Sequence, residues 1–155
     1  MTILALTRAR AWAILAGNTM IGPNDVPATD GGAKVEAALR RFALEEAADG
    51  AAFDVGYRAL DAVFGPRGEN ERREVLETWF AGPRSPPAGW PARVRVSYHL
   101  VLARDLERGG ELAGVRDAFV VLDAPARRCV SLLSHVLVLP PYRRSGLAAL
   151  LREIG

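Results

Sequence analysis

The sequence predicts an α/β fold of the α+β type, in which helices come first and a mainly antiparallel sheet follows. Apolar residues recur at helical spacing between Val35 and Phe80. From Val94 onward the spacing changes to strict alternation, which is typical of strands with one buried face. Between Cys129 and Leu139 the chain is almost wholly apolar, as in a strand that is buried on both faces.

Three helices are expected in the first half of the chain, because three apolar stripes follow one another and each ends at a helix-terminating pair. Asn70 is the expected N-cap of the third helix, with glutamates in its first turn. The terminating pairs are Asp49-Gly50, Gly65-Pro66 and Gly82-Pro83. The stripes consist of Val35, Leu39, Phe42 and Ala43; of Phe53, Tyr57, Leu60 and Phe64; and of Val75, Leu76, Trp79 and Phe80.

Three strands are expected after a proline-rich connector at 83–91. In the first strand, Val94, Val96, Tyr98, Leu100 and Leu102 alternate with the residues between them. The second strand is expected over 112–123 and the third over 128–139. A loop that contains Gly109-Gly110 and a short turn at 124–127 separate them, so neighbouring strands run antiparallel.

Length and charge limit the classes of function. A chain of 155 residues is long enough for one domain with a substantial core. The net charge is +2 and the acidic and basic residues are interleaved, so no nucleic-acid-binding surface is predicted. No apolar run approaches the roughly 20 residues that span a bilayer, so no membrane segment is predicted either.

The N-terminal segment and the single cysteine indicate a cytoplasmic protein without a metal site. Residues 1–32 form a poorly defined segment in which the charges follow the first apolar stretch, unlike a secretory signal. Cys129 is the only cysteine, so no internal disulfide can form, and no metal-ligand spacing surrounds it. We interpret Cys129 as a small strand residue.

A strand, a basic turn and a helix follow one another near the end of the sequence. Pro140 and Pro141 cannot donate to a sheet ladder, so the third strand must stop there. The turn carries Arg143 and Arg144, and the helix begins near Gly146. Unpaired amides at a helix N-terminus and the helix dipole favour an anion in this position.

This stretch resembles the acetyl-CoA site of the GCN5-related N-acetyltransferases. The family signature is Gln or Arg, two residues, Gly, one residue, and Gly or Ala, which here is Arg143-x-x-Gly146-x-Ala148. The pattern alone is weak in a chain rich in these residue types, but the apolar strand before it, the V-x-P-x-Y-R approach and the apolar helix after it make it more specific. The resemblance covers roughly residues 94–153. The alternative is an ordinary strand-turn-helix corner whose arginines serve solubility.

The resemblance implies a partial domain of this family over residues 33–155. In the family, the helix after the signature leads to another strand, another helix and usually one or two final strands, which this sequence does not contain. The C-terminal half of the fold is therefore expected to be absent. We expect either a fragment, a truncated gene product or a half-domain completed by a second chain. An open apolar strand edge would also favour a homo-oligomer.

The implied activity is transfer of an acetyl group from acetyl-CoA, as co-substrate, to an amine of a small molecule or a peptide by direct attack. A non-catalytic module that binds CoA or another protein is the alternative. No pattern in the sequence specifies the acceptor. The residues expected to bind the cofactor are Leu137, Val138, Leu139, Arg143, Arg144, Ser145, Gly146, Leu147 and Ala148.

The third strand contains no carboxylate that could act as the general base. The catalytic candidates on it are His135 and Ser134, followed by Asp117, His99 and Tyr98 on neighbouring strands. His135 has an unperturbed pKa near neutrality, which suits a base at physiological pH. Strand parity predicts that Ser134 and His135 lie on opposite faces, and a bulge could exchange them. For each of these residues, a satisfied position in the core is the favoured interpretation over a catalytic one.

Overall fold

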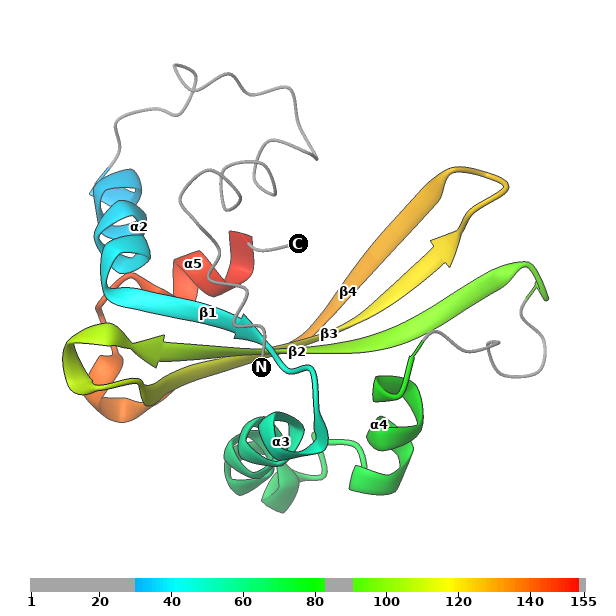
Figure 1. The fold of residues 1–155 in the computed structure, drawn as a ribbon, viewed down its shortest axis with the longest axis horizontal. Helices are drawn as coiled ribbons and strands as arrows, with labels where there is room; N and C mark the ends of the chain where they lie inside the picture. The colour runs from blue at the N-terminus through cyan, green and yellow to red at the C-terminus, as the bar shows by residue number, and fades with distance from the viewer. Residues whose placement is uncertain (1–29, 83–90, 154–155) are drawn as a thin grey trace. The chain divides into compact units, whose positions relative to one another are not determined.

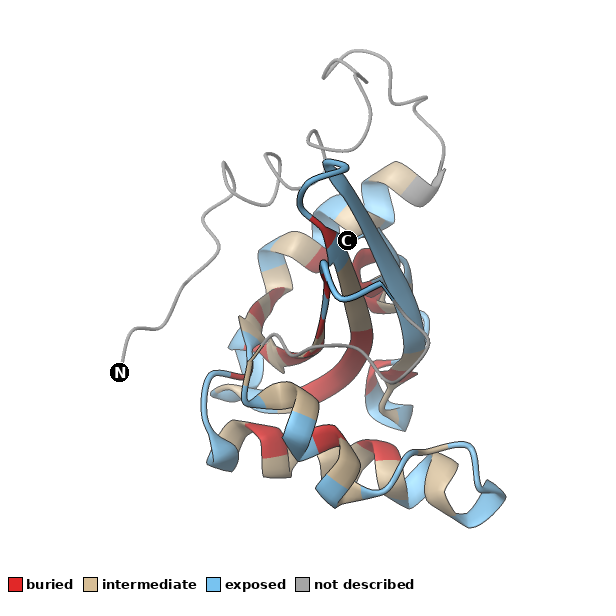
Figure 2. Ribbon diagram, turned by 90° about the vertical axis from the view of Figure 1, so that its right-hand side faces the viewer, coloured by how far each residue is buried: buried red, intermediate tan, exposed pale blue. Residues whose placement is uncertain are grey.

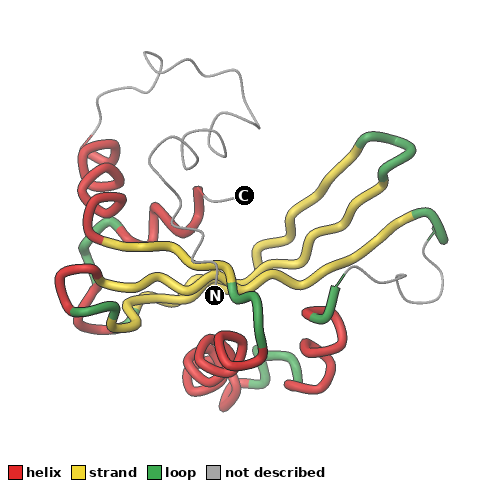
Figure 3. Tube along the Cα trace, viewed as in Figure 1, coloured by secondary structure: helices red, strands yellow, loops and turns green. Residues whose placement is uncertain are grey.

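The computed structural model describes residues 30–82 and 91–153, and it has the mixed α+β architecture that the sequence predicts (Figures 1 and 3). The predicted N-terminal segment up to residue 29 and the connector at 83–90 lie outside the described residues. Short 3-10 turns occur at Gly65–Arg67, Leu106–Arg108 and Pro140–Tyr142. The helices and strands are α2 (Asp30–Arg41), β1 (Phe42–Glu46), α3 (Gly50–Phe64), α4 (Arg73–Phe80), β2 (Val94–Asp105), β3 (Glu111–Asp123), β4 (Arg128–Val138) and α5 (Leu147–Glu153).

Within the described residues, the four strands form one antiparallel sheet in the order β1-β2-β3-β4. Strand order therefore follows chain order. β1 and β4 are the edge strands of this sheet. The elements from β1 to α5 follow one another as strand, two helices, three strands and helix.

The first predicted helix is wrong beyond Arg41, because Phe42–Glu46 forms strand β1 instead. The stripe that includes Phe42 at helical spacing also fits a strand, since Phe42 and Leu44 are both buried while Ala43 between them is half-buried. Ala47, directly after β1, donates its N–H to the carbonyl oxygen of Leu100 at 2.8 Å. Pairing with β2 outweighs the helical propensity of this short segment.

Helices α3 and α4 confirm the second and third predicted stripes, but the predicted N-cap of α4, Asn70, is wrong. Asp49 caps α3 by accepting the N–H of Ala52 at 2.9 Å. α4 begins at Arg73 after the N-cap Arg72, which makes no side-chain cap. The Asn70 side chain instead donates through Nδ2 to Asp61 on α3 at 3.2 Å.

Strands β2, β3 and β4 have nearly the predicted bounds, but the predicted burial of β4 on both faces is wrong. From Arg128 to Ser134 every residue of β4 is exposed, and Figure 2 shows this exposure along the strand. Val130 and Leu132 are 52% and 51% exposed. An apolar run indicates a buried strand only when neighbours cover it, and β4 has a paired neighbour on one side only among the described residues.

The chain divides into two compact units, each of which contains parts of several strands. The described residues of the first unit are 30–45, 102–115 and 136–153. In this unit α2 and α5 lie side by side (Figure 1) and pack together. Two glycines permit close approach: a Cβ on Gly114 would lie 2.8 Å from the carbonyl oxygen of Leu137, and a Cβ on Gly146 would lie 2.5 Å from that of Lys34 in α2.

The described residues of the second unit are 46–82, 91–101 and 116–135, and they contain an aromatic cluster. Phe53 on α3 is 1% exposed. Its ring centroid lies 4.9 Å from that of Phe80, 5.9 Å from that of Tyr57 and 6.4 Å from that of Tyr98. These contacts pack α3 and α4 against β2 within the unit, so the predicted aromatic stripe belongs to the core.

The close approach of Gly146 to α2 predicts a large loss of stability for Gly146→Ala. Gly146 has a φ of +84°, where a side chain costs about 1–2 kcal/mol, and the new Cβ would also meet the backbone of Lys34. Adding the usual cost of overpacking gives a decrease of about 3 kcal/mol in the free energy of unfolding, measured by urea denaturation.

Gly110→Ala is the matched control. Gly110 belongs to the same unit and has a similar φ of +85°, but nothing lies within 4 Å of its Cβ position. Its loss should be about 1–2 kcal/mol, from backbone strain alone. Equal losses for the two variants would show that the contact between Gly146 and α2 does not constrain the turn.

Candidate functional site

The turn after β4 begins with a hydrogen bond that still belongs to the sheet. The N–H of Leu139 donates to the carbonyl oxygen of Ala113 at 3.0 Å, so β4 remains paired with β3 at this position. Because successive residues of a strand direct their N–H groups to opposite sides, the N–H of Val138 points to the unpaired side of β4. Tyr142 and Arg143 then donate to the carbonyl oxygens of Leu139 and Pro140 at 2.9 and 3.3 Å, which closes the 3-10 turn.

Two left-handed residues bend the chain between this turn and α5. Arg144 has a φ of +66° and Gly146 a φ of +84°. The N–H of Leu147, at the start of α5, donates to the Ser145 hydroxyl over a long 3.4 Å. The turn therefore brings main-chain amides, a hydroxyl and the exposed Arg143 and Arg144 together, which is the composition of an anion site.

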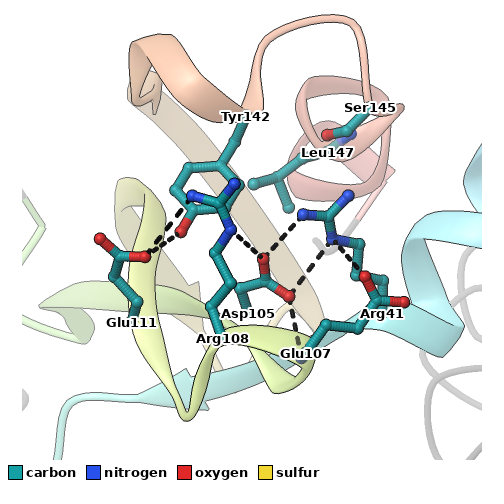
Figure 4. Close-up of polar contacts among 8 residues, drawn as sticks. All are labelled: Arg41, Asp105, Glu107, Arg108, Glu111, Tyr142, Ser145 and Leu147. Atoms are coloured by element: carbon teal, nitrogen blue, oxygen red, sulfur yellow. Dashed lines mark hydrogen bonds and ion pairs between the residues drawn. The ribbon is translucent and has the colours of Figure 1, made fainter.

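Tyr142 anchors this turn to the rest of the first unit (Figure 4). Its side chain is buried, and its hydroxyl donates to Glu111 at 2.7 Å. The guanidinium groups of Arg41 and Arg108 lie 5.9 and 5.5 Å from the ring centroid, and the Phe42 ring meets it edge to face at 6.0 Å. Burial, followed by the bond to Glu111, raises the pKa of Tyr142, so the phenol keeps its proton as donor.

Asp105, at the end of β2, organises the charged side chains below this turn (Figure 4). Its carboxylate is inaccessible to solvent and accepts two hydrogen bonds from Arg41, at 3.2 and 2.8 Å. It also accepts the N–H of Glu107 at 3.0 Å, and Arg108 lies 3.9 Å away. The bidentate bond from Arg41 is the main cause that lowers the pKa of Asp105.

The residues predicted to bind the cofactor fall into three groups by exposure. Leu137 and Leu147 are buried, so their side chains support the turn from inside the first unit. Arg143 and Arg144 are exposed. The remaining predicted residues are half-buried: Val138, Leu139, Ser145, Gly146 and Ala148.

A buried carboxylate in the second unit brings two of the other candidates together. Asp117 on β3 is 2% exposed and accepts the hydroxyl of Tyr98 at 2.9 Å. It also accepts the backbone N–H of His135 at 2.7 Å, and its two oxygens lie 3.0 and 3.2 Å from Nδ1 of that histidine. Burial, with the charge of Asp117, raises the pKa of Tyr98 far above its usual value, so Tyr98 remains a donor.

His135 is held on both sides of its ring. Nδ1 faces Asp117, and Nε2 lies 3.0 Å from the carbonyl oxygen of Glu69. The Phe64 ring packs over the imidazole at a centroid distance of 4.5 Å. Both ring nitrogens therefore face acceptors, and only a ring that donates from both satisfies the two contacts. A nitrogen that donates has no free lone pair, so the ring can act as a base only in a form in which one nitrogen carries no proton and no longer faces its acceptor.

Ser134 and His135 border the same cavity, of about 250 Å³, in the second unit. Regular alternation along β4 predicts opposite faces for these neighbours. The backbone N–H of His135 is directed to the Asp117 side chain, which a regular ladder would not require. The cavity is lined by Glu69, Asn70, Glu71, Leu76, Asp117, Phe119, Ser134 and His135.

His99, another catalytic candidate, contacts Glu46 and Ser97 and not Asp117. Its Nδ1 lies 2.5 Å from the Glu46 carboxylate, and its Nε2 lies 2.7 Å from the Ser97 hydroxyl. The hydrogen bond with His99 is the main cause that lowers the pKa of Glu46. His99 does not line the cavity that Ser134 and His135 share.

Sequence reasoning missed the cavity walls supplied by Asn70, Phe119 and the Glu69 carbonyl oxygen. Glu69 and Asn70 lie between α3 and α4, where the sequence indicated an N-cap at Asn70 and helix-start carboxylates, and neither signal places these residues beside His135. In the part of the chain that the structure describes, no helix is long and apolar enough to cross a membrane. The same residues contain no group of three or more His, Cys, Asp or Glu side chains that could hold a metal ion. Cys129 is exposed, with a free thiol.

Comparisons with protein-family models, with curated proteins and with solved structures found no match to this chain.

Tyr98→Phe should destabilise the protein by about 1–3 kcal/mol, because it removes a donor from a buried carboxylate and leaves the rest of the ring in place. Tyr57→Phe is the control, since the Tyr57 hydroxyl donates over long distances of 3.4 and 3.5 Å and should contribute about 0.5 kcal/mol or less. Urea denaturation measures both. Similar values would mean that the Asp117 carboxylate is satisfied without Tyr98.

Asp105→Asn should make the free energy of unfolding depend less on pH in the acidic range. Because the folded-state pKa of Asp105 is lowered, its stabilisation is fully present above the unfolded-state value of about 3.9 and is lost as the pH falls through the folded-state value. The wild-type chain should therefore lose stability below about pH 4 more steeply than the variant. Urea midpoints measured across this range test the difference. Glu107→Gln, an exposed carboxylate 3.5 Å from the same arginine, should leave the profile unchanged.

Proposed function

We propose that this protein is an acetyl-CoA-dependent N-acetyltransferase of the GCN5-related type, which transfers an acetyl group to an amine of a small molecule or a peptide. One observation carries the proposal. Arg143-x-x-Gly146-x-Ala148 occupies the junction between a strand and a helix, directly after the third of three consecutive antiparallel strands. This is the position that the resemblance requires for the signature.

The end of β4 supplies a main-chain donor beside the signature. The N–H of Val138 points to the unpaired edge, since Leu139 is the residue that pairs with β3. A donor in this position can polarise the thioester carbonyl and stabilise the oxyanion that forms when the amine attacks. The acetyl carbon then passes to the nitrogen and the CoA thiolate departs. Holding the thioester and the amine in register supplies the rest of the acceleration.

The turn suits the phosphate groups of CoA. Arg143 and Arg144 are exposed and can pair with phosphate oxygens, and the amides at the start of α5 offer further donors. Tyr142 and Gly146 hold the turn in this shape through Glu111 and α2 respectively. Cofactor binding therefore depends on residues that support the turn as well as on those that would touch the phosphates.

The attacking amine must lose a proton, because an ammonium has no lone pair. We assign this proton transfer to His135, with Ser134 beside it on the cavity wall. Nε2 of His135 can accept a proton only when it carries none, with Nδ1–H still bonded to Asp117 and the contact to the Glu69 carbonyl oxygen released. The hydrogen bonds to Asp117 would keep the ring oriented during this exchange.

The second candidate function is a non-catalytic module that binds CoA. The observation in its favour is that both ring nitrogens of His135 already have partners. The two functions differ in turnover alone. A thiol-release assay with acetyl-CoA and a panel of amines separates them, because the module would bind CoA and release no thiol above the uncatalysed rate.

Replacing Arg143 and Arg144 together by glutamine should weaken CoA binding at least tenfold, since charge-assisted bonds to phosphate contribute roughly 1.5–3 kcal/mol each. Isothermal titration calorimetry with CoA measures the affinity. Arg152→Gln, in the last turn of α5, removes a charge from the same helix without touching the turn and should bind as the wild type does. Equal losses in both variants, or no binding by the wild-type chain, would refute the cofactor site.

A further inference from the structure

Three side chains of the second unit form a chain of hydrogen bonds outside the cavity. Ser97 and His99 lie on β2, and Glu46 ends the neighbouring strand β1. Ser97 and His99 share a face of the sheet, because they are two residues apart on one strand. Nε2 of His99 lies 2.7 Å from the Ser97 hydroxyl, and Nδ1 lies 2.5 Å from the Glu46 carboxylate. A hydroxyl, an imidazole and a carboxylate in this order can serve as a nucleophile, its base and the group that orients the base.

The carboxylate determines which ring nitrogen of His99 carries the proton. The hydrogen bond with His99 lowers the pKa of Glu46, so the carboxylate is ionised at neutral pH and can only accept. Nδ1 must therefore donate to it. In the neutral ring, Nε2 then has a free lone pair beside the Ser97 hydroxyl and can take its proton. His99 can thus act as a base without losing a contact, whereas both ring nitrogens of His135 face acceptors.

A substrate can reach this Ser97–His99–Glu46 triad from solvent. The side chains of His99 and Glu46 are 37% and 61% exposed, and Ser97 is half-buried. Phe53 on α3 packs against Tyr98, whose side chain lies on the other face of β2 because it alternates with Ser97 and His99. Helix α3 therefore covers the opposite face and does not separate the triad from solvent.

A buried cation lies on the same face of the sheet as the triad. On β3, Asp117 accepts the Tyr98 hydroxyl at 2.9 Å, and the Phe119 ring centroid lies 5.2 Å from that of Tyr98. These contacts place Tyr98, Asp117 and Phe119 on one face. Their neighbours His99 and Arg116 then lie on the other face, directly or diagonally opposite each other. Arg116 is 7% exposed and its Nε is buried without a hydrogen-bond partner, so its charge is available to stabilise an oxyanion that forms beside the triad.

We propose that Ser97, His99 and Glu46 form a second active site, which hydrolyses small carboxylic esters through an acyl-serine intermediate. Ser97 and His99 are its catalytic residues and Glu46 is a positioning residue. An open site offers little binding surface, so its substrate must be small and reactive, which favours an ester over an amide. The site belongs to the second unit alone and uses neither the turn at 143–148 nor the cavity beside His135.

The reaction balances with these residues and water. As Oγ of Ser97 bonds to the carbonyl carbon of the ester, its proton passes to Nε2 of His99 and the carbonyl oxygen takes up the negative charge. The bond from this carbon to the alcohol oxygen then breaks, and the alcohol leaves with the proton from Nε2. Water attacks the acyl-serine and gives a proton to Nε2. The carboxylic acid then leaves, and Nε2 returns this proton to Ser97.

An organophosphorus fluoride tests the nucleophile, because an activated serine displaces its fluoride. The full chain, without CoA, is treated with diisopropyl fluorophosphate at neutral pH, and mass spectrometry of the digested chain locates the adduct. We expect it at Ser97, while the exposed Ser131 on β4 stays unmodified as an internal control. Because the wild-type chain is analysed, the result does not depend on the folding of a variant. No adduct at Ser97, or equal modification of Ser131, would overturn the proposal.

Matched variants test the base and its positioning residue through the turnover of p-nitrophenyl butyrate. His99→Gln should lower kcat at least tenfold, as is usual when a general base is lost. Glu46→Gln should also lower kcat at least tenfold with KM unchanged, because glutamine no longer fixes the tautomer, and Glu46→Asp should restore part of the rate. Glu74→Gln removes a carboxylate from the first turn of α4 and should keep the wild-type rate. Equal losses for Glu46→Gln and Glu74→Gln, or an unchanged kcat for His99→Gln, would overturn the site.

Discussion

A buried carboxylate must keep its hydrogen-bond donors, and this constraint fixes much of the structure on which both candidate sites depend. Asp105 in the first unit and Asp117 in the second are almost inaccessible to solvent. Removing a donor from such a group costs about 1–3 kcal/mol or more, which is a large fraction of the stability of a small protein. The donors, Arg41 for one and Tyr98 with His135 for the other, are therefore held in place.

The donors of Asp105 also contact the residue that supports the turn at 143–148, which carries the signature. Arg41 and Arg108 approach Asp105 and also lie over the ring of Tyr142, which begins the bend after β4 (Figure 4). The geometry of the turn thus depends on side chains from α2 and from the loop after β2, in addition to its own glycine. A short sequence pattern can name the residues that would touch an anion, but it cannot show whether distant residues hold them in position.

Periodicity predicted α3 and strands β2 to β4 because each is long and its apolar spacing is unambiguous. It failed at β1, where Phe42 and Leu44 fit both a helix and a strand in a segment too short to decide. It failed again on the burial of β4, because an apolar run does not reveal whether a neighbour covers it. His135 and Ser134 were selected from the sequence, but the partners of His135 were not. Asp117 and Glu69 lie 18 and 66 residues away, so only the fold brings them together.

The two candidate sites also explain why net charge says little about this protein. The turn at 143–148 has two exposed arginines and no carboxylate, whereas the cavity of the second unit has three carboxylates and one histidine. The net charge of +2 sums over the whole chain and shows neither site. A ligand at either site would meet the local field of that site, which the net charge does not reveal. The charge of each candidate site is therefore more informative than the net charge. It depends on contacts that sequence spacing does not show.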